Sequence, residues 1–275
     1  MLLAIDTATN LAGIALLNGQ QIPDLLHRRA DDMRPSAGGQ GVRGATQWRT
    51  GRNHTVELMP NILRLLSEAG ARADELEAVA VAIGPGSYTG LRIGLSVAKG
   101  FCLAHGAALV AVPTLDISAM ASPLRDGLLC AVLQAGRGRL AAGFYRAESG
   151  QWQRDGELFF GRAPELAEAC AGQRASSPLQ QDFTRGEPER GHSPRSNAAQ
   201  SRSELPAASG LTTYFAGELD EDSVTILRER LAGLASFAPE GEWKRDPRVL
   251  ARLGWERLRL GLTDNLETLA PAYGQ

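Results

Sequence analysis

Two short polar turns hold the side chains best suited to bind an anion or a metal ion. The first, Asp6-Thr7-Ala8-Thr9, ends an apolar run that begins at Leu2. Its hydroxyl and backbone N–H groups suit a phosphate, and its aspartate suits a hydrated metal ion. The alternative is a local turn in which Asp6 only bonds nearby backbone.

The second turn is glycine-rich and covers residues 83–94, Ile-Gly-Pro-Gly-Ser-Tyr-Thr-Gly-Leu-Arg-Ile-Gly. It follows a buried strand predicted at 78–82 and precedes a predicted helix. Backbone N–H groups gather at such a junction and suit an anion or a closely approaching backbone. The run lacks the lysine of a P-loop and the G-x-G-x-x-G spacing. A tight structural turn, with Ser87 or Thr89 capping the helix, is therefore the alternative.

Together the two turns form a candidate nucleotide or phosphate cleft. Its residues are Asp6, Thr7, Thr9, Gly84, Gly86 and Ser87.

Metal and nucleophilic chemistry find little support in the sequence. No two of the four histidines are four residues apart, and the residue four after His54 is Leu58. The paired-histidine helix of zinc or iron peptidases is therefore missing. Ser87 lacks the G-x-S-x-G elbow of a nucleophilic serine. We predict no metal site and no catalytic residue.

The strands and helices that position these turns are predicted from apolar runs and from the turn-forming residues between them. Strands are predicted at 2–5, 11–17, 20–28, 78–82, 108–112, 128–133, 140–145, 151–160 and 211–216. Helices are predicted at 54–69, after the glycine turn, and at 164–171, 222–234 and 247–262. The stretches 31–52 and 176–209 are predicted to be long insertions of low complexity. Two halves, each a meander followed by crossovers, indicate two duplicated lobes.

The helix at 54–69 is apolar on two faces, which indicates either a core position or a partner. Leu58, Ile62 and Leu65 lie on one face, and Met59 and Leu63 lie on another. The following helix has small residues every fourth position, which suit close packing within the chain or a partner helix. An exposed apolar face also predicts self-association when no partner is present.

Composition limits the classes of function. The chain has 275 residues, 43% hydrophobic and 22% charged, with a net charge of −2, which predicts no strong attraction to nucleic acid. Its three widely spaced cysteines indicate buried free thiols in a reducing compartment. The start has no basic region and no run is long enough to span a membrane. We therefore expect a cytoplasmic protein.

Four segments resemble the bacterial TsaB (YeaZ) family: residues 1–16, the His54-Thr55 helix with Pro60, the glycine run, and Val112-Pro113-Thr114-Leu115. The resemblance is close over most of residues 1–120 and looser beyond. It implies an actin-like ATPase (ASKHA, RNase H-like) α/β fold of two lobes, each with a mixed β-sheet flanked by helices. The expected lobes are 1–113, with an insertion near 31–52, and 114–275, with an insertion near 176–209.

The resemblance also implies a role in making N6-threonylcarbamoyladenosine in tRNAs that read codons starting with A. A TsaD-like paralogue would transfer the threonylcarbamoyl group, and this chain would be its non-catalytic dimerisation partner. A TsaE-like ATPase would join them, and tRNA would be met only through the complex. The family's partner surface uses the first two helices, which in this chain gives His54, Leu58, Ile62, Leu65, Leu91, Gly94, Leu95 and Ala98.

The sequence leaves two alternatives to a scaffold open. One is a self-contained nucleotide-binding protein or weak ATPase, with ATP or ADP and Mg²⁺ in the cleft or at a subunit interface. The other, an M22 glycoprotease-like peptidase, is opposed by the missing histidine pair. The second lobe also departs from the family's Asp-Ala-Arg-x-Gly-Glu-Val-Tyr-like segment, with Gln134, Gly136, Arg139 and Ala141 in place of acid, arginine, glutamate and tyrosine.

Overall fold

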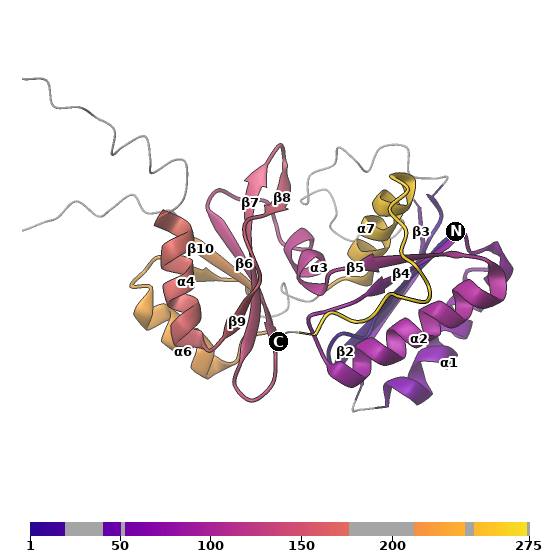
Figure 1. The fold of residues 1–275 in the computed structure, drawn as a ribbon, viewed down its shortest axis with the longest axis horizontal. Coiled ribbons are helices and arrows are strands. Elements are labelled where there is room, and N and C mark those ends of the chain that lie inside the picture. Colours follow the sequence, from indigo (N-terminus) through magenta and orange to yellow (C-terminus); the bar gives the residue numbers. More distant parts are fainter. Residues whose placement is uncertain (20–40, 51–52, 176–211, 240–244, 274–275) are drawn as a thin grey trace, which may run out of the picture.

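The computed structural model describes residues 1–19, 41–50, 53–175, 212–239 and 245–273 (Figure 1). The strand expected at 20–28 and the low-complexity stretch at 176–209 lie outside these residues. Within the described parts, none of the helices combines the length and the apolar character needed to cross a bilayer.

The first lobe is built on a five-stranded mixed sheet. Strands β1, β2 and β3 pair antiparallel, whereas β1, β4 and β5 pair parallel, in the order β3-β2-β1-β4-β5. The strands are β1 (Leu2–Asp6), β2 (Leu11–Leu17), β3 (Val42–Arg49), β4 (Ala78–Ala82) and β5 (Ala108–Val112). The central strands are buried throughout, because helices cover both faces of the sheet.

Strand β3 corrects the prediction of a loop over 31–52, which was wrong for residues 42–49. Its side chains alternate strictly between half-buried and exposed positions, as in an edge strand with one face on the core. The inward positions include Gly44 and Thr46, and the outward ones include Arg43 and Arg49. Of the four inward residues only Val42 and Trp48 are strongly apolar, and Gly44 and Thr46 lie between them, so the alternation has little hydrophobic contrast.

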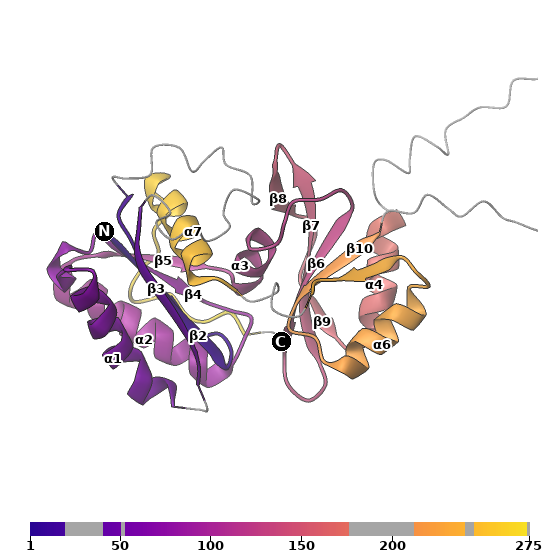
Figure 2. The same ribbon diagram turned by 180° about the vertical axis from the view of Figure 1, so that it is seen from behind.

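The two faces of this sheet pack on different helices (Figures 1 and 2). Leu3 and Ile5 face α1 (His54–Glu68) and α2 (Tyr88–His105). Leu2 and Ala4 face α7 (Pro247–Arg259), which in turn contacts α3 (Thr114–Met120). The alternation of these side chains along β1 divides one strand between two hydrophobic cores.

The second lobe contains a six-stranded mixed sheet. Helices α4 (Ala163–Ala175) and α6 (Glu221–Arg230) cover its outer face, and α3 lies on the face toward the first lobe (Figure 1). The strand order is β11-β10-β6-β7-β8, with β9 also paired to β7. The strands are β6 (Leu128–Gln134), β7 (Leu140–Glu148), β8 (Gln151–Arg154), β9 (Phe159–Gly161), β10 (Thr213–Gly217) and β11 (Ala235–Phe237).

The two-lobed α/β fold predicted from the sequence is confirmed. Some details differ, because the single strand expected at 151–160 is two short strands, and neither α3 nor β11 was predicted. Both missed elements are short, and α3 is buried along most of its length, so it shows no amphipathic period.

The chain returns to the first lobe after completing the second. Helix α7 packs across β1, β2, β4 and β5, with Val249, Leu250 and Ala251 in the core. Beyond α7, the backbone N–H of Asp264 donates to Leu109 and that of Ala272 donates to Ile83. The lobe boundary near residue 113 stays a prediction, and residues 245–273 are contributed to the first lobe from the far end of the chain.

Candidate functional site

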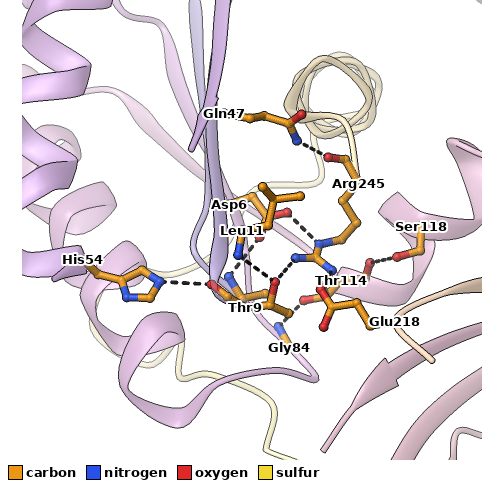
Figure 3. Close-up of polar contacts among 11 residues, drawn as sticks. Asp6, Thr9, Leu11, Gln47, His54, Gly84, Thr114, Ser118, Glu218 and Arg245 are labelled. Carbon is orange, nitrogen blue, oxygen red and sulfur yellow. Dashed lines mark hydrogen bonds and ion pairs between the residues drawn. The ribbon is translucent and has the colours of Figure 1, made fainter. Parts of the chain in front are cut away.

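A buried arginine lies at the turn that ends β1, between the two lobes (Figure 3). Arg245 is only 3% exposed, and each of its three side-chain nitrogens has a partner. Its Nε donates to Asp6 Oδ2 at 2.9 Å and its Nη2 to Thr9 Oγ1 at 2.6 Å. Its Nη1 donates to Glu218 Oε1 at 3.1 Å, and Glu218 directly follows β10 of the second lobe.

Arg245 remains charged in this environment. Burial lowers the pKa of its guanidinium, but Asp6 and Glu218 outweigh that effect and raise the pKa above its ordinary value. The backbone of Arg245 is also held, because the side-chain amide of Gln47 on β3 donates to its carbonyl oxygen. The residue is thus fixed by contacts from both lobes.

The turn itself has the Asx geometry that was the alternative to ligand binding. The backbone N–H of Ala8 donates to Asp6 Oδ1 at 2.9 Å, two residues on. Thr7 Oγ1 donates to the carbonyl oxygen of Gly90 at 2.8 Å. Thr9 Oγ1 accepts the N–H of Leu11 at 3.3 Å in addition to the bond from Arg245.

The glycine-rich run packs directly on this turn. Ser87 donates its backbone N–H to Ala8 at 2.6 Å, and its Oγ accepts the N–H of Gly90 at 3.2 Å as the N-cap of α2. A Cβ at Gly86 would overlap the carbonyl oxygen of Ala8, and one at Gly90 would overlap that of Thr7. The glycines of this run therefore make room for the backbone of the turn at residues 6–9.

The structure brings the predicted cleft residues together but leaves their polar side chains engaged. Asp6, Thr7, Thr9 and Ser87 all have partners within the chain. The N–H of Gly84 donates to Thr114 Oγ1 at 3.0 Å. These groups do not fit a metal-bound phosphate, because a ligand would have to displace both the guanidinium and the bonds within the turn.

His54, the first residue of α1, is also engaged. Its ring Nε2 lies 3.1 Å from the carbonyl oxygen of Thr9, and the side chain is buried. It therefore connects the start of α1 to the same turn (Figure 3). The described residues contain no group of three or more His, Cys, Asp or Glu side chains arranged to hold a metal ion.

The predicted partner contacts are buried in the single chain, and their role at an interface stays a prediction. All eight lie in the interior of the chain, so none offers an exposed side chain to another protein. They are His54, Leu58, Ile62, Leu65, Leu91, Gly94, Leu95 and Ala98. The face chosen from periodicity is the one that packs on the sheet, because it carries the more regular apolar spacing.

The opposite face of α1 is exposed and also apolar. Val56, Met59 and Leu63, which we call the outer stripe, follow a three- and four-residue spacing and are 73%, 37% and 56% exposed. Leu103 on the neighbouring α2 is 74% exposed.

Sequence reasoning missed the two residues that complete the site, Arg245 and Glu218. Arg245 is separated from Asp6 by 239 positions, and no local motif links them. The only signal nearby is Asp246-Pro247, recognised as a helix start, and Asp246 does cap α7.

All four departures in the second lobe have contacts within the chain. Ala141 is buried on β7, the backbone N–H of Arg139 donates to Gly136, and Gln134 Nε2 donates to Asp220 Oδ2 at 3.1 Å in an exposed contact. Arg139 lines a shallow groove of about 180 Å³ together with Gly86, Tyr88 and Tyr273. The groove runs between the glycine-rich turn and the second lobe.

Comparison with known proteins gives consistent matches. The family model described as TsaD, tRNA N6-adenosine threonylcarbamoyltransferase, matches residues 46–182. The tRNA threonylcarbamoyladenosine biosynthesis protein TsaB of Bacillus subtilis is 35% identical over 99 residues, 36% of this chain and 43% of that protein. The protein of the same name from Escherichia coli is 29% identical over 154 residues, 55% of this chain and 58% of that protein.

The matched region therefore spans about half of these curated relatives. A solved structure titled YeaZ from Pseudomonas aeruginosa superposes with a TM-score of 0.62. It is 21% identical and covers 99% of both chains. This likeness extends over both lobes and concerns the fold.

Proposed function

Because the chain belongs to the TsaB (YeaZ) family, we propose that it is a non-catalytic scaffold in the biosynthesis of tRNA N6-threonylcarbamoyladenosine. In this proposal it dimerises with a TsaD-like transferase, which performs the chemistry. The names of the relatives support a role in threonylcarbamoyladenosine biosynthesis. The exposed apolar side chains of α1 support dimerisation with another protein.

The observation that carries the proposal is the outer stripe of α1. A helix that already buries one apolar face against its own sheet has no intrachain use for a second. Exposed apolar patches of this kind mark interaction sites, and helix faces spaced in this way suit packing against another helix. On α2, Leu103 is a further exposed apolar side chain.

The inner face of α1 supports a non-catalytic role. A pair of metal-binding histidines on one helix face needs a second histidine four residues after His54. That position is Leu58, which is buried in the core of the first lobe. The ring of His54 is itself hydrogen-bonded to the turn at Thr9.

The test places one carboxylate on the outer stripe. Leu63→Glu should abolish binding to the TsaD-like protein of the same genome, because docking would bury an unpaired charge. Ala171→Glu is the matched control, since it adds the same charge at an exposed position of α4 in the second lobe. Binding would be measured by titration calorimetry, with circular dichroism to check folding. A folded Leu63→Glu chain that binds as the wild type does would overturn the proposed interface.

The remaining features of the proposal concern assembly and location. We propose that the isolated chain forms a homodimer through the same stripe, that a TsaE-like ATPase joins the heterodimer, and that tRNA is met only through the complex. A cytoplasmic location belongs to the same proposal, and the free, buried thiols of Cys102, Cys130 and Cys170 support it. Light scattering should show a dimer for wild type and a monomer for Leu63→Glu.

A further inference from the structure

Arg245 sits between two carboxylates that belong to different lobes. Asp6 ends β1, the central strand of the first sheet, and Glu218 directly follows β10 of the second sheet. The Asp6 side chain is 4% exposed and that of Glu218 is 19% exposed. The two carboxylates, one from each lobe, are thus bridged by a single guanidinium.

The guanidinium is anchored more firmly to the first lobe than to the second. On the first-lobe side it binds Asp6 and Thr9, and its own backbone accepts from Gln47. The next residue, Asp246, begins α7 by accepting the N–H of Arg248 at 2.9 Å, and α7 is packed on the first sheet. On the second-lobe side it donates to Glu218.

We propose that Arg245 is a built-in cation that closes the two lobes on one another, in the place where a metal-bound phosphate was expected. The chain would then hold its lobe arrangement without a nucleotide, and Asp6 would serve as the anchor of this interlobe clamp. This inference goes beyond the proposed scaffold role and does not depend on the partner's identity.

The clamp has two consequences that a ligand-binding cleft would not have. Wild-type chain should gain no thermal stability from Mg²⁺ with ATP or ADP, because the acidic groups are already neutralised. Removing the guanidinium should leave a cation-sized space flanked by two carboxylates. A small planar cation supplied from solution should then restore part of the lost stability.

The first experiment uses Arg245→Ala and thermal unfolding in millimolar guanidinium chloride, far below denaturing concentrations. The variant should melt well below wild type and should recover several degrees in guanidinium but not in equal sodium chloride. Wild type should show no such gain. Equal responses to the two salts, or a melting temperature of the variant equal to that of wild type, would overturn the clamp. So would a rise in the wild-type melting temperature with Mg²⁺ and ATP.

The second experiment remains informative if Arg245→Ala does not fold. Glu218→Gln removes one charge from a half-buried side chain and leaves the first-lobe half of the clamp intact. Glu229→Gln is the matched control, because it makes the same change at an exposed position of α6. We expect Glu218→Gln alone to increase the radius of gyration in small-angle scattering and to speed amide exchange in residues 6–9. Identical scattering and exchange for the two variants would refute the interlobe role, whereas partner binding through the outer stripe would be unaffected.

Discussion

Replacing single glycines along α2 with alanine tests whether the glycine-rich run serves packing within the chain. Gly90 lies at the first turn of the helix, and a Cβ there would overlap the backbone carbonyl oxygen of Thr7. Gly100 lies on the same helix, and a Cβ there would meet no heavy atom within 4 Å. The same substitution therefore probes one crowded and one open position.

The expected effects have opposite signs. In a helix, alanine is favoured over glycine by about 1 kcal/mol, and both variants gain this term. At Gly90 the added methyl pushes against backbone, which costs about 1–3 kcal/mol in overpacking, and it strains the 2.8 Å bond from Thr7 Oγ1 to the Gly90 carbonyl. Gly90→Ala should thus be destabilised by about 1–2 kcal/mol, whereas Gly100→Ala should be stabilised by about 0.5–1 kcal/mol.

Urea denaturation of the isolated chain measures the change in the free energy of unfolding for each variant. The melting temperatures of the two variants should differ by several degrees. The m-values should stay equal, because neither change alters the surface exposed on unfolding. If Gly90→Ala proves as stable as Gly100→Ala, the turn at residues 6–9 does not pack closely against α2. The glycine-rich run would then need an explanation other than packing within the chain.

Three further predictions concern burial and pH. Leu58→Ala on the inner face of α1 should lower the free energy of unfolding by about 2–5 kcal/mol, whereas Leu63→Ala on the outer stripe should change it little; equal urea midpoints would contradict the assignment of faces. Hydrogen bonds from Ser223 lower the pKa of Asp220, the N-cap of α6. The ionised Asp220 therefore stabilises the folded state fully above the ordinary pKa of an aspartate, and this stabilisation is lost as the pH falls through the lowered pKa of the folded state. Asp220→Ala should therefore cost about 1 kcal/mol at neutral pH and progressively less below about pH 4, and a cost that is constant with pH would argue against the ionised cap. Burial raises the pKa of the Cys102 thiol to about 11, and Cys130 and Cys170 are also buried, so Ellman's reagent should detect thiols only after unfolding.

The elements recovered from sequence are those with strong local patterns. The apolar runs at 2–5, 11–17 and 108–112 are buried strands, and their contrast with flanking turns places them closely. The glycine-rich run marks the junction of β4 and α2 because Ser87 caps the helix that follows. Such patterns are short-range and can be read without knowledge of the tertiary structure.

What could not be predicted depends on contacts far apart in the chain. Helix α1 is apolar on two faces, so its periodicity cannot say that Leu58 faces the sheet and Leu63 faces solvent. The pairing of Asp6 with Arg245 crosses nearly the whole chain, and a lone arginine before a helix gives no sign of its partner. The Asx turn and the phosphate site have the same sequence pattern, and only the position of Arg245 distinguishes them.

The return of α7 to the first sheet also constrains the order in which the protein can be assembled during synthesis. Helix α7 packs on the sheet face formed by Leu2, Ala4 and Ala80. This helix leaves the ribosome long after β1–β5 have been made. During that interval this apolar surface is exposed on the nascent chain, and such surface makes partly folded chains prone to aggregation. A fragment ending before residue 245 would keep that surface permanently. The first lobe therefore matures after the second has been translated, although its strands emerge first.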